Sequence, residues 1–172
     1  MLTQKMESAL NKQVERECSA SFLYLAMSAW CSRKSLDGCS KFLRRQSEEE
    51  YMHMMRIFDY VEERDGAALV PGIESPKVDY NTVHEVFEDV FQHELAVTRS
   101  IHQLMELAEE EKDYATQNFL QWYVEEQREE EMMMRQINDK IKLIGDSPQS
   151  LYFIDKELEM LNNDSMKADP PA

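Results

Sequence analysis

The sequence is poor in the residues that make turns. It has only four glycines and five prolines among 172 residues, whereas Met, Leu, Glu, Lys and Gln abound. Glycine and proline interrupt helices, so this composition predicts long helices and argues against a fold of strands and tight turns. Because 42% of the residues are hydrophobic, the chain can bury the core of a single domain.

Long apolar runs are also missing. No stretch approaches the roughly 18 apolar residues that cross a bilayer. The first residues, MLTQKMESAL, lack the basic segment and apolar stretch of a secretory signal. The three cysteines, Cys18, Cys31 and Cys39, are an odd number and fit reduced thiols better than disulfides. We therefore expect a cytoplasmic protein without a membrane partner.

Positive charge is scarce as well. Lys and Arg number 19 against 34 Asp and Glu, which gives a formal net charge of −15. Nucleic-acid phosphates are bound by clustered Lys and Arg, so no nucleic-acid partner is expected. The acidity is compatible with a protein that attracts cations, although acidic surfaces also serve solubility alone.

Helical patterns fill most of the chain. We expect long helices over about 3–32, 37–64, 82–112 and 114–144, and a short helix over about 147–162. Gly66 can end the second helix. Thr82 and Glu85 predict a reciprocal capping box at the start of the third helix, and Ser147 before Pro148 is typical of a helix start.

The connector between the second and third helices predicts the topology. Residues 65–81 contain two prolines and two glycines. Seventeen extended residues reach about 56 Å, whereas a helix of about 28 residues is about 42 Å long. The sequence therefore predicts an all-α four-helix bundle with one long crossover between helices two and three and a short fifth helix. The domain covers 1–162, and 163–172 form a flexible tail.

Each long helix carries an apolar seam with steps of three and four residues. The seams run from Leu10 to Cys31, from Cys39 to Tyr60, from Val83 to Ala108 and from Leu120 to Ile144. Acids or other ligand-type side chains interrupt every seam near the middle of its helix: Glu17, Glu50 with His53, Glu94, and Gln127 with Glu130. Since the midpoints of bundled helices meet at one height, these side chains are expected to converge in the core.

Four buried glutamates need neutralisation. An isolated buried carboxylate is unfavourable, and four of them repel one another. Protonation could neutralise some, but divalent cations would neutralise all four and use their oxygens as ligands. Glu50 and His53, three residues apart, lie on one helix face and can share a metal. Oxygen-rich ligation with one imidazole favours iron or manganese over a structural zinc ion.

Four segments are typical of one family. They are YLAMSAWCS, FLRRQSEEEYMHMMRIFDY, FLQWYVEEQREEE and LYFIDKEL. With these segments in register, residues 2–162 resemble the bacterial non-haem ferritins. The resemblance implies the ferritin-like fold, oxidation of Fe(II) by dioxygen (ferroxidase activity), and storage of ferric mineral in a homo-oligomeric shell of 24 subunits. It also implies that the fifth helix lines the four-fold axis of that shell.

The resemblance implies roles for single residues. Glu17, Glu50 and His53 match the ligands of a first iron site, with Glu50 bridging. Glu94 and Glu130 match a second site, with Gln127 beside it, and Tyr24 matches a tyrosine near this diiron centre. Glu49, Glu126 and Glu129, with Glu130 shared, match a third iron site.

No haem is expected. In the related bacterioferritins a second Glu-x-x-His lies on helix four, where this chain has Gln127 and Glu130. Their haem-binding methionine follows the bridging glutamate, where this chain has Tyr51.

Two other classes of function remain open. A diiron oxidase or oxygenase of an organic substrate would need an apolar pocket beside the metals and a reductase partner, and the sequence has no dedicated feature for either. A metal-free helical scaffold would not bind two tight irons per subunit.

Overall fold

The computed structural model describes residues 1–145 and 147–168, with only the backbone described over 164–168. Five helices make up most of this part: α1 (Gln4–Arg33), α2 (Asp37–Glu63), α3 (Val83–Glu110), α4 (Tyr114–Ile144) and α5 (Pro148–Ala168). No strand occurs among the described residues. The predicted all-α class is confirmed.

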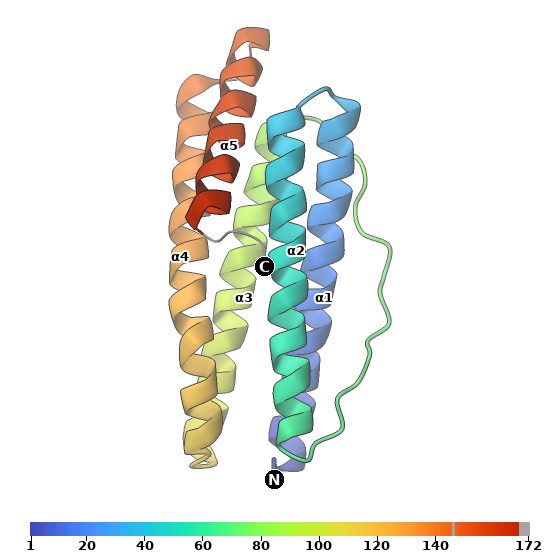
Figure 1. Ribbon diagram of the computed structural model, residues 1–172, viewed down its shortest axis with the longest axis vertical. Helices are drawn as coiled ribbons and strands as arrows, with labels where there is room; N and C mark the ends of the chain where they lie inside the picture. Colours follow the sequence, from blue (N-terminus) through green and yellow to red (C-terminus); the bar gives the residue numbers. More distant parts are fainter. Residues whose placement is uncertain (146, 169–172) are drawn as a thin grey trace.

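The first four helices form an elongated bundle (Figure 1). α1 packs along α2 and α3 packs along α4, and within each pair the helices run in opposite directions. Residues 64–82 leave the end of α2 and run along the outside of the bundle to the start of α3 at its other end. This segment is the predicted long crossover, and the predicted topology is confirmed.

Polar side chains define the helix starts as predicted, with one difference. Thr82 Oγ1 accepts a hydrogen bond from the Glu85 amide at 3.0 Å, but the Glu85 carboxylate accepts from the amide of Asn81 at 2.8 Å rather than from that of Thr82. Ser147 Oγ accepts from the amide of Ser150 at 3.1 Å. Each bond satisfies a backbone amide that the helix leaves without a partner.

Gly66 lies at the end of α2 as predicted, but it is not the residue with the left-handed conformation that often ends a helix. The left-handed residue is Asp65, with φ of 57°. The amide of Gly66 then donates to the carbonyl of Val61 at 2.9 Å. A Cβ at Gly66 would lie 2.9 Å from Val61 Cγ1, so glycine is needed here for close approach rather than for its conformation.

The fifth helix is longer than predicted. We expected it to end near Asn162, but α5 continues to Ala168. Since no glycine or proline occurs between Pro148 and Ala168, nothing in the local sequence stops the helix earlier. The predicted flexible tail over 163–172 is therefore helical over 163–168, and residues 169–172 lie outside the described part.

α5 folds back from the end of α4 and packs against α2 (Figure 1). The amide of Cys39, near the start of α2, donates to Asp155 Oδ1 at 2.9 Å. A Cβ on Gly38 would lie 2.0 Å from the backbone oxygen of Asp155. The contact between the two helices therefore requires glycine at this position.

The predicted seams are buried, with one exception. Ile144, the last residue of α4, is 37% exposed, because the helix ends there and no neighbour covers its side chain fully. The three cysteines are buried and unpaired. In the described part of the chain, no helix is both long enough and apolar enough to cross a membrane.

Candidate metal centre

A polar layer divides the core into two apolar clusters. One cluster surrounds Met27 and Phe87, and the other surrounds Leu10 and Ile57. On α3, for example, Glu94 lies between Val90 of the first cluster and Val97 of the second. The polar residues that interrupt the four seams therefore form one layer across the folded bundle.

All six side chains that interrupt the seams are at most 6% exposed. α1 provides Glu17, α2 provides Glu50 and His53, α3 provides Glu94, and α4 provides Gln127 and Glu130. The prediction that these side chains lie in the core is confirmed by their burial. Because water does not reach them, the carboxyls must be protonated, or their charges must be balanced by other groups of the protein or by a bound cation.

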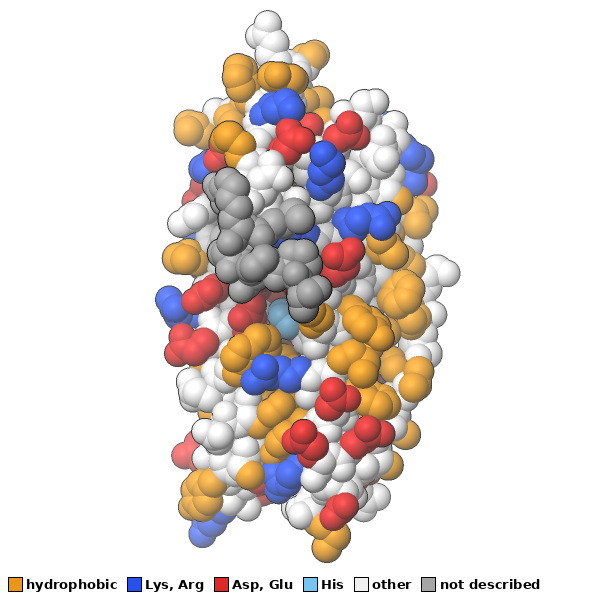
Figure 2. Space-filling view, viewed as in Figure 1, with side chains coloured by type: hydrophobic (Ala, Val, Ile, Leu, Met, Phe, Trp, Pro, Cys, Tyr) orange, Lys and Arg blue, Asp and Glu red, His pale blue; other side chains and the backbone are white. Residues whose placement is uncertain are grey.

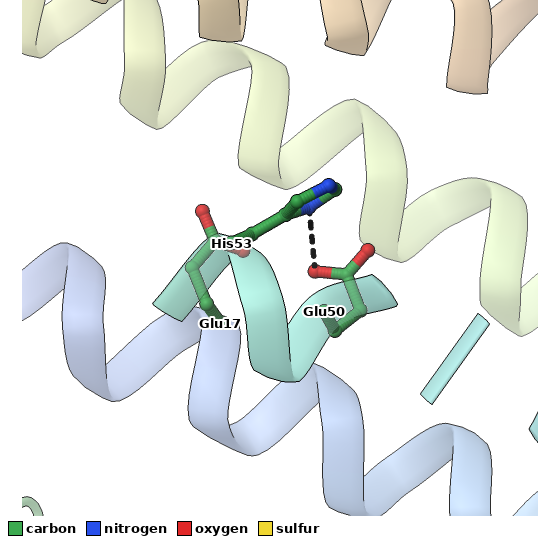
Figure 3. A group of neighbouring side chains, drawn as sticks. All are labelled: Glu17, Glu50 and His53. Carbon is green, nitrogen blue, oxygen red and sulfur yellow. Dashed lines mark ion pairs between the residues drawn. The ribbon is translucent and has the colours of Figure 1, made fainter. Parts of the chain in front are cut away.

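Three of these residues form a potential metal site. Glu17, Glu50 and His53 each present a ligand atom, and these atoms lie within 4.8 Å of one another (Figure 3). His53 Nδ1 is 3.7 Å from Glu50 Oε2. Glu17 Oε2 and Glu50 Oε1 are buried, and no amide or hydroxyl of the described residues donates to either oxygen. The two carboxyls are close enough to share a hydrogen bond when one of them is protonated. Buried carboxylate oxygens without a donor fit a divalent cation.

The next carboxylate already has two donors. Glu94 Oε1 accepts a short hydrogen bond from the Tyr24 hydroxyl, and Glu94 Oε2 accepts from Gln127 Nε2 at 3.1 Å. Tyr24 comes from α1 and Gln127 from α4, so three helices meet at this carboxylate. Tyr24 and Gln127, which the resemblance places beside the centre, therefore both contact Glu94.

Burial changes the protonation of the carboxylates. It raises the pKa of Glu17 to about 7, and burial together with the charges of Glu94 and Glu17 holds the pKa of Glu50 well above its usual range. The pKa values of Glu94 and Glu130 are also raised, mainly by burial. Without a cation, the core therefore favours protonated carboxyls.

Burial acts on His53 in the opposite sense. It lowers the pKa of His53 to about 4, and the positive charge of Arg56 lowers it further. The imidazole is therefore neutral at pH 7, which is the form that binds metals.

An aromatic wall supports His53. The rings of His53 and Trp122 meet edge to face, with centroids 5.3 Å apart, and the Arg56 guanidinium lies over the Trp122 ring at 4.2 Å. The Tyr123 hydroxyl donates to the backbone oxygen of His53 at 2.7 Å. These contacts fix the position of the imidazole beside Glu50.

The residues matched to a third site are only partly assembled. Glu49 binds Arg45, and Glu126 Oε1 lies 3.8 Å from His53 Nε2. Their two charges contribute to the raised pKa of Glu130. Glu129 is 66% exposed and lies 3.5 Å from Arg128. The structure thus brings Glu49 and Glu126 near Glu130 and leaves Glu129 facing solvent.

Sequence reasoning missed the amides around the centre. Gln13 Nε2 donates to Glu17 Oε1 at 2.8 Å. Gln46 Nε2 donates to Glu49 Oε2 at 2.8 Å and lies 3.5 Å from each oxygen of Glu130. A signal existed, because Gln46 lies in the α2 seam and Gln13 lies one turn before Glu17. Polar residues within one turn of a ligand are candidates for holding it.

Fold and site together define a class. A four-helix bundle whose facing helices direct glutamates and a histidine into the core is typical of helical proteins that bind a pair of metal ions. Residues 7–144 match the family model described as Ferritin-like domain. The chain belongs to the ferritin family, which supports a role in handling iron in general.

Individual relatives cover nearly the whole chain. A bacterial non-heme ferritin of Escherichia coli O6:H1 is 44% identical over 162 residues, which are 94% of this chain and 98% of the relative. One from Campylobacter jejuni is 41% identical, covering 92% of this chain and 95% of the relative. An open pore ferritin of Archaeoglobus fulgidus is 43% identical with a TM-score of 0.90, covering 92% of this chain and 98% of that structure.

Proposed function

We propose that the protein oxidises Fe(II) with dioxygen at a two-metal centre inside each subunit and stores the ferric product. The observation that carries the proposal is the burial of four carboxylates on four helices, two of which have an oxygen to which no amide or hydroxyl of the described chain donates. Metal ions are the species that would neutralise all of them at once. Iron is here the substrate and the cargo.

Glu50 is proposed to lie between the two metal positions. Glu17, Glu50 and His53 would hold one ion, and Glu50, Glu94 and Glu130 the other. The negative charges of Glu17, Glu94 and Glu130 all contribute to the raised pKa of Glu50, which is consistent with a central place among them. Gln127 and Tyr24 would orient Glu94 through the hydrogen bonds that they donate.

The ligand set suits oxidation followed by release. Two Fe(II) ions side by side can supply two electrons to one dioxygen molecule, so no one-electron product such as superoxide has to leave. Carboxylates are hard ligands that favour Fe(III) over Fe(II). Because only one imidazole is present, the oxidised ions are held weakly enough to be displaced toward the mineral.

We propose a third iron position beside the centre, with Glu49, Glu126, Glu129 and the shared Glu130 as ligands. The proximity of Glu49 and Glu126 to Glu130 supports it. Glu129 would have to turn from Arg128 toward the ion, which a solvent-exposed side chain can do at little cost. This position would supply a further electron or a path for iron.

We also propose a shell of identical subunits, 24 in number, in the cytoplasm. Figure 2 shows hydrophobic side chains gathered over the α1–α2 side of the molecule. Phe22, Leu25 and Met52 on these helices are exposed, as are Tyr152 and Phe153 on α5. Exposed apolar side chains in such numbers are typical of surfaces that subunits cover.

The function is tested by aerobic addition of Fe(II) to the wild type and to a variant with Glu50→Ala and His53→Ala. The wild type should develop ferric absorbance quickly, and the variant should approach the rate of Fe(II) in buffer. Equal rates in the two proteins would overturn the proposal. The molecular mass in solution tests the shell, because a monomer or dimer would contradict it.

The two alternatives give different results. A metal-free scaffold would show no tight Fe(II) binding in an anaerobic titration, whereas the proposed centre should bind about two ions per subunit. An oxygenase of an organic substrate needs a hollow beside the metals. Two surface hollows lie between α1 and α3 (about 330 Å³) and between α4 and α5, and no seam-interrupting residue lines either of them.

A further inference from the structure

Gln13 binds one of the two carboxylate oxygens of Glu17 and leaves the other for the proposed metal site. The Gln13 side chain is buried, one turn before Glu17 on α1, and its Nε2 donates to Glu17 Oε1 at 2.8 Å. No amide or hydroxyl in the described part of the chain donates to Glu17 Oε2, and the other hydrogen-bonding neighbour of this carboxyl is Glu50, a member of the same cluster. The amide therefore occupies one oxygen and leaves the other for the cluster with Glu50 and His53 (Figure 3).

Ser100 on α3 determines which way the Gln13 amide faces. Ser100 is buried, and its hydroxyl lies 2.7 Å from Gln13 Oε1 and 2.8 Å from the carbonyl of Val97, so its single hydrogen has these two acceptors. Arg16 Nη1 also approaches Gln13 Oε1, at 3.5 Å. With donors on its oxygen side, the amide must direct its N–H groups toward Glu17. The hydrogen bonds thus connect Ser100 on α3, through Gln13 on α1, to the carboxylate of Glu17.

Two other carboxylates of the centre have a similar partner. Glu94 accepts from the amide of Gln127, and the amide nitrogen of Gln46 lies 3.5 Å from both oxygens of Glu130. Among the hydrogen bonds of the described residues, no glutamine amide reaches Glu50. A neutral amide orients a carboxylate without the positive charge by which Lys or Arg would compete with a metal ion. Within this part of the chain, Glu50, the proposed bridging residue, is therefore the one carboxylate of the four that no glutamine amide orients.

We propose that Gln13 is a positioning residue for the first metal site and that Ser100 acts through it. The inference rests on the proposed function, because it assigns a purpose to the amide only if Glu17 binds a metal. The amide holds Glu17 so that it offers one oxygen, aimed at the same point as Glu50 and His53. Without it, Glu17 is free to rotate, and the site must restrain the side chain each time a metal binds.

The test uses Co(II), which binds without oxidation and reports ligand geometry through its visible absorption. Anaerobic calorimetric titrations compare the wild type with Gln13→Leu, which removes the donor at similar volume. We expect Co(II) affinity at the site containing His53 to fall by about 10–100-fold, with altered absorption bands. A His53→Ala variant identifies that site, and Gln103→Leu, on the exposed face of α3, is the matched control that should behave as wild type.

Variants of Ser100 provide a second test in the same titration. Ser100→Ala should weaken Co(II) binding less than Gln13→Leu does, and Ser100→Thr, which keeps the hydroxyl, should restore it. Because Ser100 is proposed to act only through Gln13, the double variant should bind as Gln13→Leu alone. If Gln13→Leu does not fold, the comparison of Ser100→Ala with Ser100→Thr still decides the question.

Three results would overturn the inference. Wild-type affinity and absorption in Gln13→Leu would make Gln13 a packing residue, even if its urea unfolding midpoint were lower. Additive effects of the two substitutions would show that Ser100 does not act through Gln13. Equal binding by Ser100→Ala and Ser100→Thr would show that the hydroxyl has no part. Failure of the wild type to bind two ions is a different outcome, because it contradicts the proposed function itself.

Discussion

Tyr24 of α1 donates its hydroxyl hydrogen to Glu94 of α3, and both side chains lie in the core. The bond connects the two antiparallel helix pairs at the height of the polar layer. Burial and the neighbouring negative charges of Glu94 and Glu50 hold the pKa of Tyr24 well above its usual range, so the phenol remains a donor at neutral pH. Glu94 is thereby oriented from α1 as well as from α4.

Tyr24→Phe should weaken the second metal site selectively. The substitution leaves the ring in place and removes one donor to Glu94, so the carboxylate loses part of its orientation. We expect two Fe(II) ions still to bind anaerobically, with the ion at the proposed site of Glu94 and Glu130 bound less tightly by roughly tenfold. Calorimetric titration measures this directly. A loss of affinity confined to the ion that His53→Ala removes would contradict the assignment of Glu94 to the second site.

Single ligand substitutions should remove metals in a defined order. His53→Ala should abolish one Fe(II) per subunit, and Glu130→Ala should abolish the other. Glu50→Ala should weaken both, because Glu50 is proposed to lie between them. Anaerobic titration gives the stoichiometry of each variant. Loss of a single ion in Glu50→Ala, with the other bound at wild-type affinity, would show that Glu50 is not shared.

The metal-free protein should become less stable as the pH rises through neutrality. Glu17 has a pKa of about 7 in the folded chain against an ordinary 4.5, so the folded state binds more protons between these values. The stability that this proton provides is fully present below pH 4.5 and is lost as the pH rises through 7. The shift corresponds to about 3 kcal/mol at pH 8.

Urea unfolding with a chelator present, at pH 5, 6, 7 and 8, measures this dependence. Glu17→Gln should make the profile less steep, because its neutral amide has no proton to lose. The remaining slope comes from Glu50, Glu94 and Glu130, whose pKa values are also raised. A divalent metal should flatten the profile by stabilising the ionised carboxylates. A wild-type profile no steeper than that of Glu17→Gln would show that the Glu17 carboxyl does not titrate as described.

Gly38→Ala should separate α5 from α2. The new methyl group would overlap the backbone oxygen of Asp155, and backbone cannot move aside as a flexible side chain can. We expect a loss of about 1–3 kcal/mol in unfolding free energy, with faster protease cleavage in α5. Gly72→Ala is the matched control, since a Cβ there meets nothing within 4 Å. Because α5 supplies none of the proposed ligands, anaerobic Fe(II) stoichiometry should be unchanged.

Periodicity and the length of the connector were sufficient to predict most of the fold. Steps of three and four residues identified the seams, and the length of the segment 65–81 predicted the crossover. The C-terminal end of α5 could not be located in this way, because the polar run after Asn162 has no residue that forbids a helix. Seam composition likewise predicted which acids would be buried, since Glu17 and Glu94 occupy positions that apolar residues otherwise fill.

Contacts between helices could not be read from the chain. Ser100 and Gln13 are 87 positions apart, and only the packing of α3 against α1 brings them within 2.7 Å. Gly38 gives no sign in the sequence that it lies under α5. Spacing along one helix predicts a shared face, as it did for Glu50 and His53, but it does not predict what a neighbouring helix places opposite that face.

The central claim is that buried carboxylates from separate helices share two metal ions. Crystals soaked anaerobically with Fe(II), with diffraction data collected on both sides of the iron absorption edge, test it most directly. We predict two anomalous peaks per subunit, one within bonding distance of Glu17, Glu50 and His53 and one within bonding distance of Glu50, Glu94 and Glu130. Well-ordered crystals with no peak inside the bundle, or with these side chains turned toward bulk water, would contradict the claim.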